Sequence, residues 1–271
     1  MSIDQESAHR IATQLEQSER SRQHITQLST AYPQLSIADA YAVQQAWVAL
    51  KMSQGRSIEG HKVGLTSKAM QLAFGIDEPD YGVLFDDMFY EDGAVLPMED
   101  FIVPQVEVEL AFVLKSDLKG PNVRITDVYA ATDYVMPALE IIDARFYPVC
   151  PETGTARKVF DTIADNAACA GVVLGGRPAK LSEVDARWVG CVLSRNGQIE
   201  ETGLAAGVMN HPANGVVWLA NKLAEHGVTL RAGQVILSGS FTRPSPAQPG
   251  DVFHADYGSL GSIQCRFGCL D

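Results

Sequence analysis

The segment PQVEVELAFVL, residues 104–114, has the alternating pattern of a β-strand, and the interpretation of the whole chain starts from it. Valine, leucine and phenylalanine occupy every second position from Val106 to Leu114, so these side chains share one face. The other face begins with Glu107 and Glu109 and then becomes apolar. Strands that are apolar on both faces are typical of protein interiors. The sequence therefore predicts a buried strand over about 105–115 that carries two carboxylates on one face.

Helices are expected before this strand. One is predicted over about 4–30, and a second begins after Ser36 and ends at Gly55. Ser36 is a favourable N-cap, and Asp39 three residues later forms a weaker version of the capping box. The first part of the chain is therefore predicted to be mostly helical.

Short strands and glycine-rich turns dominate the remainder of the chain. The dipeptide Asn196-Gly197 lies between two alternating segments and is a strong signal for a β-hairpin. Strands outnumber helices, and long helices do not alternate regularly with strands. We therefore expect an α+β fold, with a helical N-terminal part (1–57) and a mixed, largely antiparallel β-rich catalytic domain (58–271).

Composition and charge exclude several classes of function. The chain has 271 residues, 46% of them hydrophobic, and a formal net charge of -12. This charge argues against partners such as nucleic acids and anionic membranes, which favour basic surfaces. The first residues are too charged for a signal peptide, and no apolar run reaches the roughly 18 residues of a membrane span. Five cysteines without C-x-x-C spacing are typical of a reduced, cytoplasmic protein.

Glu107 and Glu109 are candidates for metal ligands. Residues two apart on a strand share a face, with Cα atoms about 6.6 Å apart, so both carboxylates can converge on one cation. The alternative is that they face water on a half-exposed sheet. Glu140, in PALEIIDAR, is a third acid in an apolar strand, and Asp143 is its rival. Three carboxylates suit Mg²⁺ or Mn²⁺, which prefer oxygen ligands.

Lys62 and Asp80 are candidates for catalysis. Lys62, in GHKVGLTSK, interrupts an apolar strand and could pair with a substrate carboxylate near a metal; the alternative is a lysine that protects an edge strand. Asp80, in EPDYG, is the aspartate of its segment best placed for acid–base work. Ser240 and Thr242 follow Gly239 in a small-residue loop that allows close approach to a ligand, with ordinary turn chemistry as the alternative.

Together these features resemble the fumarylacetoacetate hydrolase family, and within it the hydratases and decarboxylases of aromatic meta-cleavage pathways. The resemblance covers nearly the whole chain. It is carried by GHKVGLTSKAMQ, EPDYGVLFDDMF, FIVPQVEVELAFVL, TDYVMPALEIIDAR, KVFDTIADNAACAGVVLGG, AAGVMNHPANGVVWLANKLA and GQVILSGSFTRPSPAQPGDVFHADYGSLGSI.

The resemblance implies a divalent metal, usually Mg²⁺, held by Glu107, Glu109 and Glu140, with Lys62 and Asp80 near the substrate. Many relatives carry a serine in the loop where this chain has Ala167 and Ala168, which puts a hydroxyl role there in doubt. The resemblance also implies a large homo-oligomer, often a decamer.

The implied substrate is a small anionic 2-oxo-4-enoate or its 2-hydroxydienoate tautomer. The first choice is hydration of 2-oxo-hept-4-ene-1,7-dioate to 4-hydroxy-2-oxoheptane-1,7-dioate in homoprotocatechuate catabolism. The alternatives are hydration of 2-hydroxypentadienoate, decarboxylation of 4-oxalocrotonate, and a non-catalytic partner of a decarboxylase. Arg145 and Arg243 are candidates for binding a distal carboxylate, and a structural ion pair is the alternative for each.

Overall fold

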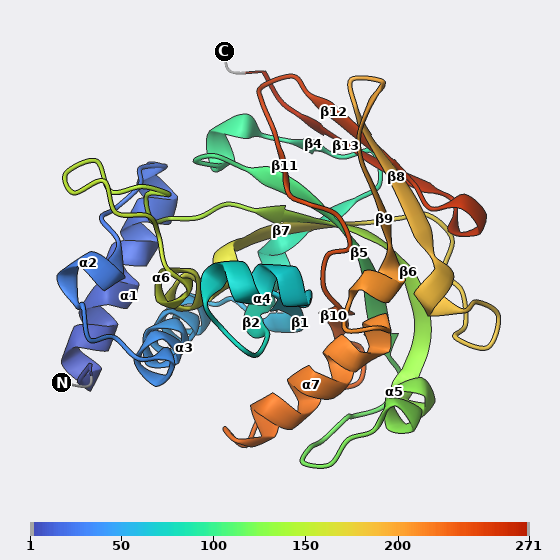
Figure 1. Cartoon of the computed structure of the whole chain (residues 1–271), viewed down its shortest axis with the longest axis horizontal. Helices are drawn as coiled ribbons and strands as arrows, with labels where there is room; N and C mark the ends of the chain where they lie inside the picture. The colour runs from blue at the N-terminus through green and yellow to red at the C-terminus, as the bar shows by residue number, and fades with distance from the viewer. Residues whose placement is uncertain (1–2, 270–271) are drawn as a thin grey trace.

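Two β-sheets follow the N-terminal helices in the computed structural model, which describes residues 3–269 (Figure 1). The larger sheet has eight strands and the smaller sheet has five. In spatial order, the larger sheet contains β2 (Asp80–Phe85), β1 (Ile58–Gly64), β10 (Val235–Leu237), β5 (Gln105–Leu114), β6 (Thr132–Ile142), β7 (Cys169–Leu174) and β3 (Phe89–Glu91), and β11 (Ser245–Pro246) also pairs with β5. The smaller sheet contains β4 (Val95–Leu96), β13 (Ser262–Phe267), β12 (Val252–Asp256), β8 (Gly190–Arg195) and β9 (Gln198–Leu204).

Most neighbouring strands run antiparallel. Among the described strands, the parallel pairs are β1–β10, β3–β7 and β4–β13. The hairpin predicted at Asn196-Gly197 connects β8 to β9, and both residues have positive φ, at 53° and 78°, as a type I′ turn requires. The predicted α+β fold with a mixed, largely antiparallel β-structure is confirmed.

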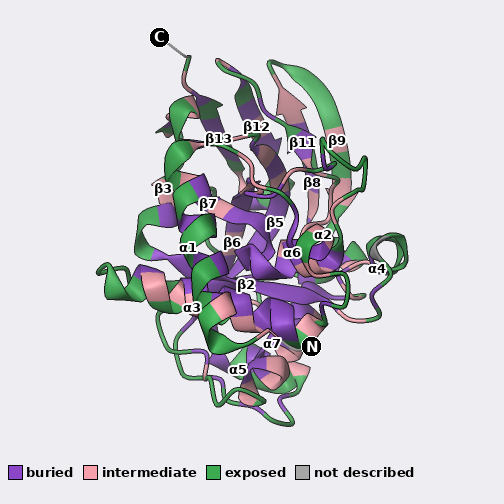
Figure 2. Ribbon diagram, turned by 90° about the vertical axis from the view of Figure 1, so that its left-hand side faces the viewer, coloured by how far each residue is buried: buried purple, intermediate pink, exposed green. Residues whose placement is uncertain are grey.

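Strand β5 lies at the centre of the larger sheet, between β10 and β6. Its predicted apolar face is fully buried, since Val106, Val108, Leu110 and Phe112 are all 0% exposed. Figure 2 shows the buried segments of β2, β5 and β6 in the interior of the molecule. The prediction of a buried strand is therefore confirmed, with bounds within about one residue of those expected.

The N-terminal part contains α1 (Gln5–Ser21), α2 (Leu28–Ala31) and α3 (Ile37–Ser53). The predicted cap of α3 is present: Ser36 Oγ accepts a hydrogen bond from the N–H of Asp39, and Asp39 Oδ2 accepts one from the N–H of Ser36. These two bonds satisfy backbone donors that a helix leaves unpaired at its start.

The helix predicted over 4–30 is wrong as one continuous helix, because α1 ends at Ser21 and α2 begins only at Leu28. Arg22 adopts a left-handed conformation with φ of 55°, which ends α1. The chain then becomes extended, and Ile25 forms a β-bridge with Phe146. Its N–H donates to the carbonyl of Arg145 at 2.9 Å. A partner about 120 residues away, which local sequence does not reveal, therefore replaces the helical hydrogen bonds.

Helix α3 contacts the larger sheet and also holds α1 in place. Gln44 of α3 donates from Nε2 to the carbonyls of Tyr81 and Ile163, at 2.8 and 3.1 Å. Trp47 is 1% exposed and donates from its indole nitrogen to Glu16 at 3.0 Å. One cluster of buried apolar side chains runs from α1 to β13, so the helices and both sheets share a core.

The other helices are α4 (Lys68–Phe74), α5 (Ile125–Ala131), α6 (Val159–Ala164) and α7 (Pro212–Ala224). Helices α5 and α7 contact each other on the side of the larger sheet remote from β12 and β13 (Figure 1). None of the described helices is long and apolar enough to cross a membrane.

Candidate active site

Three glutamates from two adjacent strands form a cluster. Glu107 of β5 lies directly opposite Glu140 of β6 in the antiparallel register, and Glu109 follows two residues later on the same face of β5. One carboxylate oxygen of each lies within 4.8 Å of the others. The sheet register therefore gathers the three carboxylates that the sequence singled out.

Three buried oxygens of this cluster have no hydrogen-bond partner. Glu109 and Glu140 are 1% and 0% exposed, and Glu107 is half-buried. Glu109 Oε2 accepts a hydrogen bond from the N–H of Gly239 at 2.8 Å, but Glu109 Oε1 and both oxygens of Glu140 have no hydrogen-bond partner. Buried carboxylates without partners are costly. Their unpaired oxygens fit a hard divalent cation, which compensates like charges at this spacing.

The pKa values of Glu107 and Glu109 reflect the same cost of burying neighbouring carboxylates. Burial, and then the charge of Glu140, raise the pKa of Glu107 to about 8. The same causes raise the pKa of Glu109 well above its usual range. Protons therefore compete with a cation for these two carboxylates near neutral pH.

Asp143 does not join the cluster. Its two carboxylate oxygens accept hydrogen bonds from the N–H groups of Ile102 and Val103, at 2.6 and 2.8 Å. Of the two candidates for the third carboxylate, the structure thus brings Glu140 to the cluster, while Asp143 fixes the chain just before β5.

Lys62 lies against the cluster from the neighbouring part of the sheet. Its Nζ lies 3.1 Å from Glu140 Oε1 and forms an ion pair with it. Burial alone would lower the pKa of Lys62, but the nearby carboxylates, Glu140 foremost, raise it above its ordinary value. The edge-strand alternative is wrong, because β1 lies between β2 and β10 and Lys62 is 3% exposed.

Asp80 is the first residue of β2, and its carboxylate lies beside Gly64 and Lys62 of β1. It is 1% exposed, pairs in register with Gly64, and its Oδ1 has no hydrogen-bond partner. A Cβ at Gly64 would lie 2.2 Å from Asp80 Oδ1 and 3.5 Å from Lys62 Nζ. Burial raises the pKa of Asp80, Lys62 opposes this shift and Glu140 adds to it. Asp80 is therefore a buried acid with a free oxygen beside the cluster.

A cavity of about 450 Å³ opens onto the cluster. Glu107, the least buried of the three glutamates, contributes to its wall. The residues that line it include Gly64, Leu65, Thr66, Met70, Glu107, Glu201, Ser240, Phe241, Thr242 and Arg243. A small molecule in this cavity would therefore contact the carboxylate cluster at one end.

Ser240 and Thr242 line this cavity, but their hydroxyls already have local partners. Ser240 Oγ donates to the carbonyls of Val108 and Thr242, at 3.2 and 3.0 Å. Thr242 Oγ1 accepts from the N–H of Val108 at 3.3 Å. These bonds match the alternative of turn chemistry and fix the loop against β5.

Arg145 is held in a structural ion pair. It is 1% exposed, and its guanidinium bonds to the side chain and carbonyl of Asp165 and to the carbonyl of Cys169. Its Cζ lies 4.9 Å from the ring centroid of Trp47. These contacts assign Arg145 to the ion-pair alternative, with its donors turned to the protein interior.

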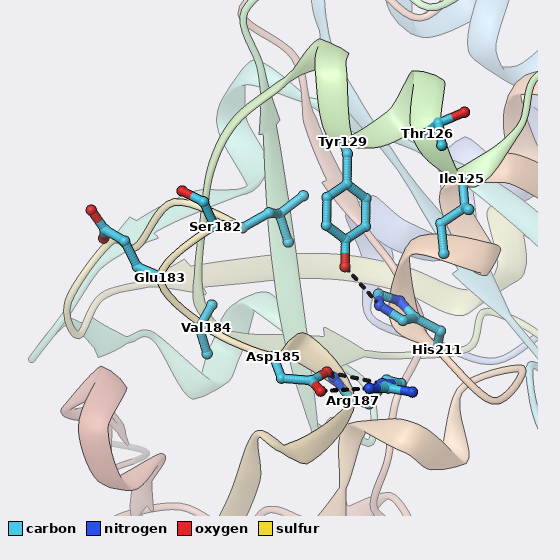
Figure 3. A pocket seen from close by; sticks show the side chains of 10 residues that line it. Ile125, Thr126, Tyr129, Ser182, Glu183, Val184, Asp185, Arg187 and His211 are labelled. Atoms are coloured by element: carbon cyan, nitrogen blue, oxygen red, sulfur yellow. Dashed lines mark hydrogen bonds and ion pairs between the residues drawn. The ribbon is translucent and has the colours of Figure 1, made fainter.

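A second cavity, of about 670 Å³, lies between α5, the segment around residue 185 and the start of α7 (Figure 3). His211 Nε2 lies 3.0 Å from Tyr129 Oη, and His211 Nδ1 accepts a hydrogen bond from the N–H of Ala213. Asp185 and Arg187 form an ion pair at its edge. None of the three clustered glutamates lines this cavity.

The sequence did not reveal Asn166 and Tyr257 as supports of the site. Asn166 accepts from the N–H of Val83 and donates to its carbonyl, at 2.7 and 2.8 Å, and so holds β2. The Tyr257 hydroxyl lies 3.1 Å from the carbonyl of Glu109 and 2.7 Å from that of Ala138, bridging β5 and β6. Both residues lie in segments that carry the family resemblance, but their supporting roles are found only from long-range contacts.

The loop expected to carry a serine in related proteins is strained here. Asn166, Ala167 and Ala168 all have positive φ, at 51°, 51° and 58°. All three are buried, and the two alanines supply no hydroxyl. This loop therefore contributes backbone shape rather than a side-chain donor.

Comparisons with known proteins agree with this fold. Residues 55–268 match the model of the fumarylacetoacetate (FAA) hydrolase C-terminal family. The chain is 63% identical over 257 residues to 2-oxo-hept-4-ene-1,7-dioate hydratase of Escherichia coli, covering 95% of this chain and 96% of that protein. It is 39% identical over 256 residues to 2-keto-4-pentenoate hydratase of Paraburkholderia xenovorans (strain LB400), covering 94% of this chain and 93% of that protein.

A solved structure has the same fold throughout. The 4-oxalocrotonate decarboxylase from Pseudomonas putida G7, complexed with magnesium and adipate, superposes with a TM-score of 0.93 at 37% sequence identity. The superposition covers 98% of this chain and 99% of that chain.

Proposed function

Because this chain belongs to the fumarylacetoacetate hydrolase family, we propose that it is a divalent-metal-dependent hydratase, a hydro-lyase that adds water to a 2-oxo-4-enoate. The proposed substrate is 2-oxo-hept-4-ene-1,7-dioate, and the product is 4-hydroxy-2-oxoheptane-1,7-dioate, a step in homoprotocatechuate catabolism. One structural observation carries the proposal: three clustered glutamates, two of them buried with unpaired oxygens, lie beside a charged lysine at the wall of a cavity. The 63% identical hydratase supports the choice of substrate.

The three glutamates are the proposed metal ligands. Glu107, Glu109 and Glu140 would hold Mg²⁺, with Mn²⁺ as the alternative, because hard oxygen ligands suit both ions. When bound, the cation supplies positive charge at the carboxylate and 2-oxygen of the substrate. The decarboxylase with the same fold was solved with magnesium, which supports this assignment.

Lys62 and Asp80 are the proposed catalytic side chains. Lys62 keeps its charge despite burial, so its ammonium can orient the C1 carboxylate of the substrate at the cluster. Asp80 can move a proton through Oδ1, the oxygen that has no hydrogen-bond partner. Hydration adds one proton at a carbon and one hydroxyl at C4, so a buried acid near the reacting carbons is needed. Both side chains are almost fully buried, so little bulk water reaches them.

The alternatives share this chemistry and differ in substrate and outcome. They are hydration of 2-hydroxypentadienoate and decarboxylation of 4-oxalocrotonate, and relatives of each kind are 39% and 37% identical to this chain. The test is a panel of C5, C6 and C7 2-hydroxydienoates incubated with the Mg²⁺-loaded protein. We expect fastest loss of dienol absorbance with the C7 dioate and a mass gain of one water. Release of CO₂ without gain of water would instead establish a decarboxylase.

We also propose a homo-oligomer in the cytoplasm, with a decamer as the assembly that the family resemblance suggests. Trp188, just before the β8–β9 hairpin, is 67% exposed, and Ile199, on the hairpin, is 70% exposed. Exposed apolar side chains favour association. All five cysteines are free thiols, as in a reducing compartment. Light scattering should give a mass of several chains, and Ile199→Glu should lower it; a monomeric wild-type protein would contradict the oligomer.

A further inference from the structure

The loop of residues 238–246 is fixed along the strand that carries the clustered glutamates. The N–H of Ser238 donates to the carbonyl of Leu110, and the N–H of Phe241 donates to that of Val108, each at 3.2 Å. Ser245 then pairs with Val106 as part of β11. The loop therefore follows β5 past Glu109 and Glu107 in turn, and its side chains take defined positions beside them.

Arg243 lies on the solvent side of this loop. Its side chain is 82% exposed, and the following residue, Pro244, restricts its backbone to extended conformations. It lines the cavity that opens onto the glutamate cluster. Among the described residues that line this cavity, it is the one arginine or lysine.

Glu201 of β9 binds the edge of the Arg243 guanidinium formed by Nε and Nη2. Arg243 Nε and Nη2 lie 2.9 and 2.8 Å from the same oxygen, Glu201 Oε1. The Glu201 side chain is 18% exposed and lines the same cavity. A guanidinium has five N–H donors, so the edge formed by Nη1 and Nη2 keeps donors for a second carboxylate. That edge suits the parallel, two-bond geometry of an arginine–carboxylate pair.

We propose that Arg243 binds the distal carboxylate of a dicarboxylic substrate, and that Glu201 positions its guanidinium. This inference rests on the proposed function, because it takes the C1 end of the substrate to lie at the glutamate cluster. Phe241, Leu65 and Met70 line the cavity as well and provide apolar contacts for the carbon chain between the two charged ends. The subsite would make the protein select dioates over monocarboxylates of equal length.

The test compares two ligands that differ only at the distal end, 2-oxoheptanedioate and 2-oxoheptanoate. Neither has the double bond to be hydrated, so calorimetry on the Mg²⁺-loaded protein measures binding without turnover. We expect wild type to bind the dioate at least about tenfold more tightly. Arg243→Ala should bring this ratio close to one, and Arg243→Lys should keep part of it, since lysine offers a charge without the fork.

Further variants separate a specific contact from general electrostatics. Glu201→Gln keeps an oxygen acceptor for Arg243 while removing the negative charge, so it should keep or increase the preference for the dioate. Glu201→Ala removes the acceptor and should lower the preference; an unchanged preference in this variant would show that Glu201 does not position Arg243. Arg231→Ala is the matched control: Arg231 is an exposed arginine in an ion pair with Asp117, and it does not line the cavity. This control should keep the wild-type ratio.

The outcomes distinguish the subsite from the proposed function. An unchanged ratio in Arg243→Ala, or equal binding of both acids by wild type, would overturn the subsite while leaving the oxo-acid site intact. Failure of wild type to bind either acid in the presence of Mg²⁺ would overturn both proposals. A collapse of the ratio in Arg243→Ala, with Arg231→Ala like wild type, supports the subsite.

Discussion

Glu107 and Glu140 lie directly opposite each other on antiparallel strands β5 and β6. Two like charges at such a position normally destabilise a sheet. Here Glu109 adds a third carboxylate within 4.8 Å, and Lys62 is the cation in contact with Glu140. The fold therefore maintains an arrangement that a divalent cation would stabilise, and the following predictions test its consequences.

Removing one charge from the cluster should stabilise the metal-free protein. In Glu109→Gln, the amide oxygen can still accept from the N–H of Gly239, and the cost of burying a carboxyl group that ionises in the unfolded chain is removed. We expect the free energy of unfolding without metal to rise by about 1–3 kcal/mol, and the stabilisation of wild type by Mg²⁺ to disappear. Urea unfolding with and without Mg²⁺ measures both effects. Glu152→Gln, at an exposed glutamate, is the control; a less stable metal-free Glu109→Gln would contradict the account.

A methyl group at position 64 should impair the site without breaking the fold. In Gly64→Ala the new Cβ would lie 2.2 Å from Asp80 Oδ1, so the Asp80 carboxylate must move away from Lys62. We expect kcat to fall by about 10²-fold or more, because acid–base catalysis depends on this geometry. Gly190→Ala is a matched control, since its Cβ would have nothing closer than 3.6 Å. Steady-state kinetics with the C7 dienol gives the answer, and equal kcat values for the two variants would argue against a role for Asp80.

Arg145 should matter for stability. Arg145→Met leaves the Asp165 carboxylate, which is 0% exposed, without its principal counter-charge. We expect a loss of about 3–5 kcal/mol in the free energy of unfolding. The exposed pair of Arg231 and Asp117 provides the comparison, and Arg231→Met should cost less than about 1 kcal/mol. Similar small losses in both variants would contradict the structural role.

His211 should make the stability of the fold depend on pH. Its Nδ1 accepts from the N–H of Ala213 and so caps α7. Burial, and then the charge of Arg187, lower the pKa of His211, while Asp185 opposes this shift. A group with a lowered folded pKa contributes stability above its unfolded value of about 6.5, and that stability is lost as pH falls.

The control for this pH dependence is His211→Asn, because asparagine caps helices and does not titrate. Between pH 7 and 5, wild type should lose up to about 1 kcal/mol of unfolding free energy relative to this variant, the usual contribution of an N-cap. Urea midpoints across this range measure the difference. A constant difference between the two proteins would show that His211 does not titrate as described.

The sequence revealed those features that local patterns encode. Alternation around Glu107 and Glu109 predicted a buried strand with two carboxylates, and Glu140 was singled out because it interrupts an apolar strand. The register that places Glu140 opposite Glu107 joins strands through pairing that no local pattern specifies. The early end of α1 has the same cause, since Ile25 forms a β-bridge with Phe146, a residue far away in the sequence.

The supporting contacts of the site were also beyond local patterns. The N–H of Gly239 reaches Glu109 across 130 positions, and Tyr257 reaches the carbonyl of Glu109 across 148. The third carboxylate of the cluster is Glu140 because its side chain points toward Glu107 and Glu109. Asp143 turns to the backbone of Ile102 instead, a contact fixed by the three-dimensional fold.

We propose above all that the three clustered glutamates hold the divalent cation on which hydration depends. The most direct measurement is a calorimetric titration of metal-free protein with Mg²⁺, followed by turnover of 2-hydroxyhepta-2,4-dienedioate, for wild type and for the double variant Glu107→Gln, Glu109→Gln. Wild type should bind one Mg²⁺ per chain and form the hydrated product, whereas the folded double variant should bind none and form no product. Full turnover by the double variant, or by wild type in excess chelator, would contradict the claim.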